Sequence, residues 1–215
     1  MTERYLQQSP LAHMGLLARV QDGRGEAGIT LAERRFQGIV DLRGDAGDPA
    51  FLGAVESALG FVLPTTACTA AGEGGSGALW IGPNEWWIIT PGVGPGEDGP
   101  ATAERLRQVL AGQHVAVTDL SDSRTCIRVA GPRARDLLAK GCPLDLHPCV
   151  FGPNCCAGSL LAKAAVVLHQ VGAAAGDEAA DDPTFDVYVA RSFAEYLWCW
   201  LEDAAREYGL AVVEA

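Results

Sequence analysis

The sequence predicts an α+β fold of two similar halves, each with helices on one face of a mainly antiparallel sheet. A strand–helix–strand–strand–helix order occurs twice, once within residues 36–112 and again within residues 113–215. Apolar residues alternate with polar ones in the short strands and recur every three to four residues in the helices. We therefore expect an N-terminal segment over residues 1–35, followed by the two α+β halves over residues 36–112 and 113–215, all in one compact unit.

In the first half, glycine, proline and asparagine mark the ends of the predicted elements and the turns between them. A strand over residues 36–44 ends in glycine, and a helix over residues 48–59 ends at Gly60, a common position for glycine after a helix. Residues 79–90 read as two short strands around a Gly-Pro-Asn turn. A helix over residues 102–110 closes this half.

The second half begins with the best-defined stretch of the chain, residues 114–140. Gly131-Pro132 ends its second strand, Pro132 suits the first turn of a helix over residues 133–140, and Gly141 stands at the C-cap position. An apolar segment over residues 159–169, a strand over residues 185–189 and a final helix follow. The strand before Gly131 places Thr125, Ile127 and Val129 on one face and Arg124, Cys126 and Arg128 on the other.

The final helix is predicted over residues 193–208. Ser192 and Glu195 have the spacing of a capping box, and Gly209 ends the helix. Trp198 lies at the flank of the predicted apolar stripe, about a quarter-turn from its centre, so it either completes the core or contacts another chain. The predicted stripe comprises Phe193, Leu197, Trp200, Leu201, Ala204 and Tyr208.

Composition excludes several classes of function. The 215 residues carry a net charge of −11, which argues against binding to nucleic acid or to an anionic membrane surface. The start of the chain has both charge signs and no apolar core of a signal peptide, and no uncharged apolar run approaches the about 18 residues of a membrane helix. We expect a cytoplasmic protein that contacts neither nucleic acid nor membrane.

Three segments have the composition of loops. Residues 70–77 are rich in glycine and predict a mobile connection, residues 91–100 contain too many prolines and glycines for a regular element, and the acidic residues 172–183 predict weak order. None has the pattern of a phosphate-binding loop or a dinucleotide fingerprint.

The seven cysteines, an odd number without a secretion signal, predict reduced thiols. Five potential zinc ligands lie within fifteen residues, but they include no C-x2-C pair, and prolines stiffen the segment. We therefore expect a reduced, metal-free cluster, although a small metal-binding module is an alternative. The ligands are Cys142, His147, Cys149, Cys155 and Cys156.

No catalytic constellation is predicted. His114, His147 and His169 are scattered, and no nucleophile elbow occurs. The polar cluster of Asp119, Asp122 and Arg124 favours turn hydrogen bonding over chemistry. We expect no catalytic, cofactor-binding or metal-binding residue.

The candidate functional residues are therefore those of a contact surface. Arg124 and Arg128 occupy the strand face opposite the apolar one, in an otherwise acidic chain, and arginine suits carboxylate pairing at interfaces. Together with Trp198 they are the predicted interface residues.

Several stretches together resemble the gamma subunit of heterotetrameric sarcosine oxidase. They cover most of the chain between residues 79 and 209 and are LWIGPNEWWIITPG, VTDLSDSRTCIRVAGPRARDLLAKGCPLDLHP, TFDVYV and RSFAEYLWCWLEDAAREYG. The DLSDSR…IRVAGPRARDLL portion also resembles, more distantly, the folate-binding aminomethyltransferase superfamily. That likeness agrees with the repeated α+β pattern.

The resemblance implies a complex that oxidatively demethylates sarcosine to glycine, forms hydrogen peroxide and passes the one-carbon unit to tetrahydrofolate. It implies partner alpha, beta and delta subunits that carry NAD, FAD, FMN, tetrahydrofolate and zinc, with no cofactor in this chain. Two alternatives stay open beside it: an independent folate-dependent aminomethyl-transfer protein, and a subunit of a related oxidase for another N-methylated amino acid.

Overall fold

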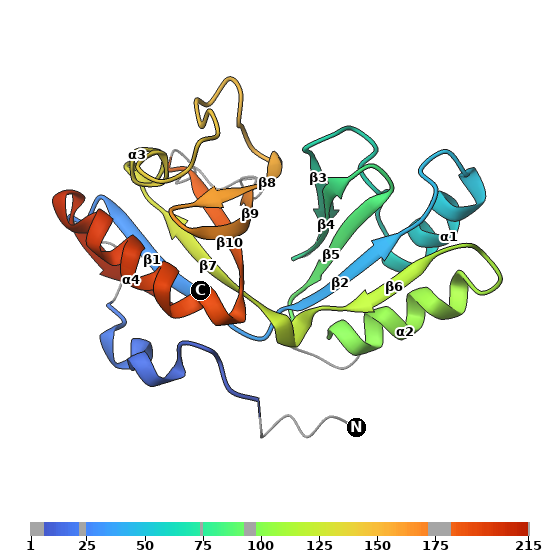
Figure 1. The fold of residues 1–215 in the computed structure, drawn as a ribbon, viewed down its shortest axis with the longest axis horizontal. Helices are drawn as coiled ribbons and strands as arrows, with labels where there is room; N and C mark the ends of the chain where they lie inside the picture. Colours follow the sequence, from blue (N-terminus) through green and yellow to red (C-terminus); the bar gives the residue numbers. More distant parts are fainter. Residues whose placement is uncertain (1–6, 22–24, 74, 93–97, 172–181, 215) are drawn as a thin grey trace. The chain divides into compact units, whose positions relative to one another are not determined.

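The computed structural model describes residues 7–21, 25–73, 75–92, 98–171 and 182–214 (Figure 1). The chain divides into two compact units, each with its own sheet. The five-stranded unit comprises Phe36–Arg124 and Asn154–Ala157, and the six-stranded unit comprises Met1–Arg35, Thr125–Pro153 and Gly158–Ala215. The predicted α+β class with mainly antiparallel sheets is confirmed.

In the five-stranded unit the sheet order is β3-β4-β5-β2-β6, and neighbouring strands are antiparallel. Two helices, α1 and α2, belong to this unit and contact each other (Figure 1). The strands are β2 (Gly38–Arg43), β3 (Ala70–Glu73), β4 (Ser76–Gly82), β5 (Glu85–Thr90) and β6 (Ala116–Asp119); the helices are α1 (Pro49–Leu59), α2 (Gly99–Val109) and the short 3-10 helix η4 (Ser121–Ser123).

Side-chain caps set where the two helices of this unit begin. The carboxylate of Asp48 accepts a hydrogen bond from the backbone N–H of Ala50, and Gly60 ends α1 with a φ of 83°, as predicted. Asp98 caps α2 in the same way through Ala101. Helix α2 therefore begins at Gly99, three residues before its predicted start and inside the predicted loop of residues 91–100, of which residues 93–97 lie outside the described part.

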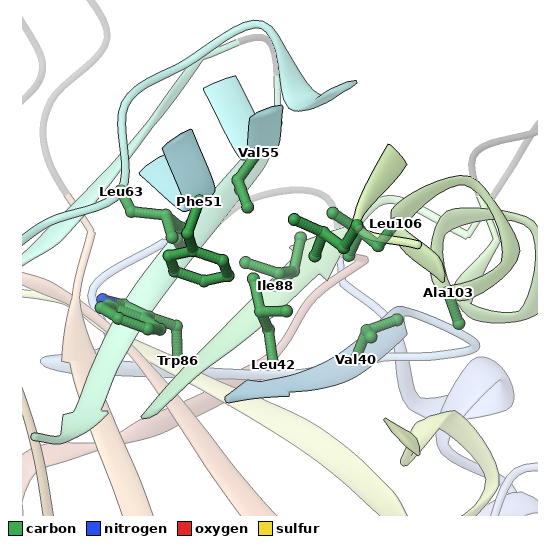
Figure 2. Close-up of a cluster of buried hydrophobic side chains, with 11 residues drawn as sticks. Val40, Leu42, Phe51, Val55, Leu63, Trp86, Ile88, Ala103 and Leu106 are labelled. Atoms are coloured by element: carbon green, nitrogen blue, oxygen red, sulfur yellow. The ribbon is translucent and has the colours of Figure 1, made fainter. Parts of the chain in front are cut away.

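The core of the five-stranded unit lies between its sheet and its two helices (Figure 2). Phe51 of α1 packs on Trp86 of β5 with ring centroids 5.8 Å apart, and the indole N–H of Trp86 donates to the carbonyl of Pro64 at 2.7 Å. That bond satisfies a fully buried polar atom, which would otherwise be costly. Alternate residues of the strands point into this core. The buried side chains labelled in Figure 2 are Val40, Leu42, Phe51, Val55, Leu63, Trp86, Ile88, Ala103 and Leu106.

In the six-stranded unit the sheet order is β11-β1-β7-β10-β9-β8. Strand β1 runs parallel to β11 and antiparallel to β7, and β9 and β10 are antiparallel. The strands are β1 (Ile29–Arg34), β7 (Arg124–Ala130), β8 (Cys156–Leu161), β9 (Ala164–Gln170), β10 (Thr184–Ala190) and β11 (Leu210–Val212); the α-helices are α3 (Ala134–Ala139) and α4 (Ala194–Ala205); the 3-10 helices are η2 (Ala12–Met14), η3 (Leu16–Arg19), η5 (Arg191–Phe193) and η6 (Arg206–Tyr208).

The division between the units differs from the predicted one. The predicted N-terminal segment contributes β1 to the six-stranded sheet, where both neighbours of β1 come from later in the chain. The boundary therefore falls between Arg124 and Thr125 and not near residues 112–113. Strand pairing over such sequence distances leaves no local signature, so the short β1 and β11 were not predicted.

Two further predictions need correction. The predicted mobile connection over residues 70–77 contains the antiparallel strands β3 and β4, in which Ala70 pairs with Leu79. Gly141 does not take the left-handed conformation of a C-cap glycine. An added Cβ there would lie 2.7 Å from the Trp200 ring, so glycine is needed for close packing. The acidic residues 172–181 lie outside the described part.

Helix α4 is rotated relative to its predicted stripe. The 3-10 turn η5 precedes it, and the Ser192 capping box does not form, because no side chain caps this helix end. The buried residues are Ala194, Leu197, Trp198, Leu201 and Ala205, a helical spacing displaced by one position from the prediction. Within the described residues, no helix combines the length and apolar character needed to cross a membrane.

Candidate functional site

The densest cluster of charged and titratable side chains lies on one face of the six-stranded sheet. Arg34 of β1 is the cross-strand partner of Cys126 of β7, and Asp186 of β10 is the partner of His169 of β9. Cross-strand partners share a face, and alternation along β7 places Arg128 on the same face as Cys126. Four neighbouring strands thus bring these side chains together.

Asp186 is the centre of this cluster. Arg128 binds its carboxylate with two nitrogens, Nε at 2.8 Å from Oδ1 and Nη2 at 3.0 Å from Oδ2. Arg34 adds Nη1 at 2.7 Å from Oδ2. The Asp186 side chain is only 2% exposed, whereas those of Arg34 and Arg128 are 22% and 28% exposed. Bidentate, charge-assisted pairing of this kind is strong and fixes geometry.

The two arginines keep Asp186 ionised despite its burial. Burial alone raises the pKa of the Asp186 carboxyl, but the hydrogen bonds and charges of Arg128 and Arg34 together bring that pKa below its ordinary value. Burial likewise opposes the charge of Arg128, yet Asp186 raises the pKa of Arg128 overall. The three groups therefore act as one ionic network, which we call the Asp186 network.

His169 lies beside this network without a hydrogen-bond partner on either ring nitrogen among the described residues, although both nitrogens are buried. Burial lowers the pKa of His169 to about 4; Asp186 opposes the shift, and Arg128 and Arg34 add to it. The imidazole is therefore neutral at neutral pH.

Cys126 and Tyr188 complete the face, and both are almost fully buried. Burial is the main reason that the pKa of each group lies well above its ordinary value. The charge of Asp186 adds to the shift of the Cys126 pKa, and Cys126 adds to the shift of the Tyr188 pKa. A protonated thiol and phenol are poor nucleophiles, and a carboxylate held by two arginines is a poor base. The arrangement therefore suits a structural role in organising β1, β7 and β10.

The structure separates the three predicted interface residues. Trp198 is fully buried within the chain, so the core alternative accounts for its position and it has no surface to offer a partner. Arg128 belongs to the Asp186 network, while the guanidinium of Arg124 lies 4.9 Å from the ring centroid of Trp87 in the five-stranded unit. Both arginines are partly exposed, so they stay candidates for contact.

The end of η5 and the first turn of α4 expose other large apolar side chains, Phe193 and Tyr196, to solvent. Phe193 and Tyr196 are 44% and 39% exposed and form an edge-to-face pair with ring centroids 6.3 Å apart. Leu17 of η3 is 62% exposed, and its neighbour Arg19 pairs with Glu202 of α4. Tyr196 could have been predicted as exposed, because it is an aromatic residue outside the predicted apolar stripe. The sequence analysis did not identify it, because the buried face of the helix was predicted one position away from its true place.

The polar turn after β6 is a hydrogen-bonded turn, as favoured from the sequence. The carboxylate of Asp119 accepts from the backbone N–H of Ser121 at 3.0 Å and from its hydroxyl. The Ser121 Oγ in turn accepts from the backbone N–H of Ile39. These bonds join the turn to β2.

The cysteines of the predicted cluster are divided between the two units. Cys142 is buried and Cys149 exposed in the six-stranded unit, whereas Cys155 and Cys156 belong to the five-stranded unit. No group of three or more His, Cys, Asp or Glu side chains able to hold a metal ion occurs among the described residues. The reduced, metal-free state of these thiols stays a prediction.

Comparison with known proteins places this fold in a class. It is similar to a crystal structure of the glycine cleavage system aminomethyltransferase T from Bartonella henselae, with a TM-score of 0.64 and 14% identity over 97% of this chain and 59% of that one. At this identity the likeness shows the fold alone, an aminomethyltransferase-like α+β architecture. The model of the sarcosine oxidase, gamma subunit family matches residues 43–207. The chain therefore belongs to the sarcosine oxidase gamma subunit family.

Individual relatives agree over nearly the whole chain. Sarcosine oxidase subunit gamma from Corynebacterium sp. (strain U-96) is 32% identical over 97% of this chain and 94% of its own length. Sarcosine oxidase subunit gamma from Arthrobacter sp. shares the same identity and coverage. A chain of heterotetrameric sarcosine oxidase from Corynebacterium sp. U-96, solved in complex with pyrrole 2-carboxylate, matches with a TM-score of 0.78 over 94% of this chain and 96% of that chain.

Proposed function

We propose that this chain, as a gamma subunit of a heterotetrameric sarcosine oxidase, an oxidoreductase complex, has a structural role in assembly and supplies no catalytic residue. The family match over residues 43–207 is the observation that carries the subunit assignment. The structural role is supported by the chemistry of the sheet face around the Asp186 network, where the Cys126 thiol, the Tyr188 phenol and the Asp186 carboxylate are all held in unreactive states.

The complex is proposed to demethylate sarcosine oxidatively to glycine, with formation of hydrogen peroxide and transfer of the one-carbon unit to tetrahydrofolate. Its alpha, beta and delta subunits are proposed to bind NAD, FAD, FMN, tetrahydrofolate and zinc. The described residues of this chain do not fit zinc, because they gather no set of three ligands. An independent aminomethyl-transfer protein is not favoured, since the chain spans 59% of the aminomethyltransferase it resembles and belongs to the gamma subunit family.

The proposed contact surface is the end of η5 and the first turn of α4, through Phe193 and Tyr196 and not through Trp198. Exposed aromatic side chains are the residue type enriched at interface hot spots. The edge-to-face pair fixes both rings on the surface of the six-stranded unit, so little conformational entropy is lost when a partner covers them. The occupant we propose is another subunit of the oxidase.

The test is co-expression of the tagged chain with the other subunits, followed by affinity purification and size-exclusion chromatography. Phe193→Ala with Tyr196→Ala should leave the melting temperature of the chain unchanged but reduce the recovered complex at least tenfold, the effect of losing about 1.4 kcal/mol of binding. Trp198→Ala is the matched control on the same helix and should lower the melting temperature.

A separate pair of variants, Arg124→Ala and Arg128→Ala, asks whether the arginine face also contributes to assembly. Full recovery of the complex by the Phe193/Tyr196 variant would exclude this surface. Failure of the unaltered chain to co-purify with any partner subunit would contradict the proposed role itself.

A further inference from the structure

Three of the seven cysteines lie together in the five-stranded unit, outside the Asp186 network and outside the proposed contact surface. Cys68 precedes β3, and Cys155 and Cys156 lie where β8 begins. Thr69 and Cys155 are partners in an isolated antiparallel bridge. Cys68, a turn residue with a φ of 61°, and Cys156 are the next residues outward from this bridge.

Backbone hydrogen bonds hold the two segments in this register. The N–H of Cys156 donates to the carbonyl of Cys68 at 2.9 Å, and the N–H of Ala70 donates to the carbonyl of Asn154 at 2.7 Å. Standard bond lengths on either side of the 2.9 Å bond between Cys156 and Cys68 keep their two Cα atoms within about 7 Å of each other. Cα atoms farther apart than about 7 Å could not be joined by a disulfide without backbone movement.

The side chain of Cys156 also lies on the side of Cys68. Its thiol donates to the carbonyl oxygens of Thr69 at 3.2 Å and of Trp80 at 3.4 Å. Burial raises the pKa of Cys156 to about 12, and of its two sulfur neighbours Cys68 raises that pKa more than Cys155, which is adjacent in sequence.

The two thiols differ in accessibility in the way that a reactive cysteine differs from its resolving partner. Cys68 is exposed, whereas Cys156 is fully buried. Because its high pKa keeps Cys156 protonated at neutral pH, an oxidant reacts first at Cys68. Cys155 is partly exposed and lies opposite Thr69, one position away.

We propose that Cys68 and Cys156 form a reversible disulfide when the chain meets a peroxide. In the first step hydrogen peroxide oxidises the Cys68 thiol to a sulfenic acid and is itself reduced to water. In the second, slower step the small thiolate fraction of Cys156 attacks the sulfur of that sulfenic acid. The S–S bond forms, and the hydroxyl leaves with the proton released from Cys156 as a second water. Two thiols and one hydrogen peroxide thus give one disulfide and two waters.

The experiment uses the full chain with Cys149→Ser and Cys199→Ser, since these are the other exposed thiols. The chain is treated with one equivalent of hydrogen peroxide, alkylated, digested and analysed by tandem mass spectrometry with and without dithiothreitol. We expect a Cys68–Cys156 cross-link that dithiothreitol removes, with two fewer alkylated thiols per chain. The oxidised chain should also melt at a higher temperature, because the bond closes a long loop.

Three single variants sharpen the assignment. Cys68→Ser and Cys156→Ser should each abolish the cross-link, and serine at position 156 keeps a donor for the carbonyls of Thr69 and Trp80. Cys155→Ser is the matched control and should retain the cross-link. Pairing of Cys68 with Cys155, irreversible oxidation of Cys68 without a cross-link, or no reaction in the otherwise unaltered chain would each overturn the proposal.

Discussion

His169→Phe is expected to make the folded chain more resistant to acid. The ring nitrogens of His169 are buried beside Asp186, Arg128 and Arg34, and they have no hydrogen-bond partner among the described residues. Phenylalanine keeps an aromatic ring on β9 and removes the group that must take up a proton as the pH falls. No hydrogen bond to a described residue is lost with the substitution.

The magnitude follows from the difference between the folded and unfolded pKa of His169. The unfolded value is near 6.5 and the folded value is about 4. Above about pH 6.5 neither state binds the proton, so the contribution to stability is fully present. Below about pH 6.5 His169 takes up a proton in the unfolded state but not in the folded state, so the free energy of unfolding falls until about pH 4. At about 1.4 kcal/mol per pH unit the total loss is about 3 kcal/mol.

Urea unfolding of the wild type and of His169→Phe at several pH values between about 7 and 4 measures this difference. The wild type should lose about 3 kcal/mol more than the variant over that range. His114→Phe is the matched control, because that side chain is exposed, and it should follow the wild type. Parallel curves for the wild type and His169→Phe would refute the reasoning.

Three further predictions concern stability. Asp186→Ala leaves two arginines facing each other and should cost about 3–5 kcal/mol in the free energy of unfolding, whereas Asp136→Ala, in the exposed pair with Arg133, should cost about 1 kcal/mol or less. Trp198→Ala should cost about 3–5 kcal/mol in the same denaturation assay, and Trp198→Phe much less, because the buried indole N–H has no partner among the described residues. Arg135→Lys should speed hydrogen exchange over residues 146–151, because Arg135 donates to the carbonyls of Leu146 and Phe151; unchanged exchange would show that this guanidinium does not hold the segment.

Local chemistry in the sequence predicted the local structure well. The turn at Asn84 has a φ of 64°, and α1 ends at Gly60, because both positions need conformations that few residues adopt. The alternation of β7 placed Arg124 and Arg128 on a face opposite Ile127. These features depend on residues close together in the chain, so a single sequence contains the information.

Contacts between residues far apart in the chain could not be predicted from the sequence, for physical reasons. The Asp186 network joins strands whose residues lie up to 152 positions apart, and no local pattern indicates such a pairing. One signal was available, since Asp186 interrupts an otherwise apolar strand and a buried carboxylate requires a partner. The sequence did not decide which face of α4 is buried, because alanines lie on both sides of the apolar stripe. Phe193 and Ala194 were therefore equally compatible with the core.

The central claim is that this chain assembles with the oxidase but performs no chemistry by itself. The most direct measurement is the visible absorption spectrum of the purified, separately expressed chain, together with its rate of sarcosine oxidation. Our account predicts a colourless protein with no turnover, and a flavin spectrum with turnover only for the complex. A flavin spectrum or sarcosine turnover from the isolated chain would contradict it.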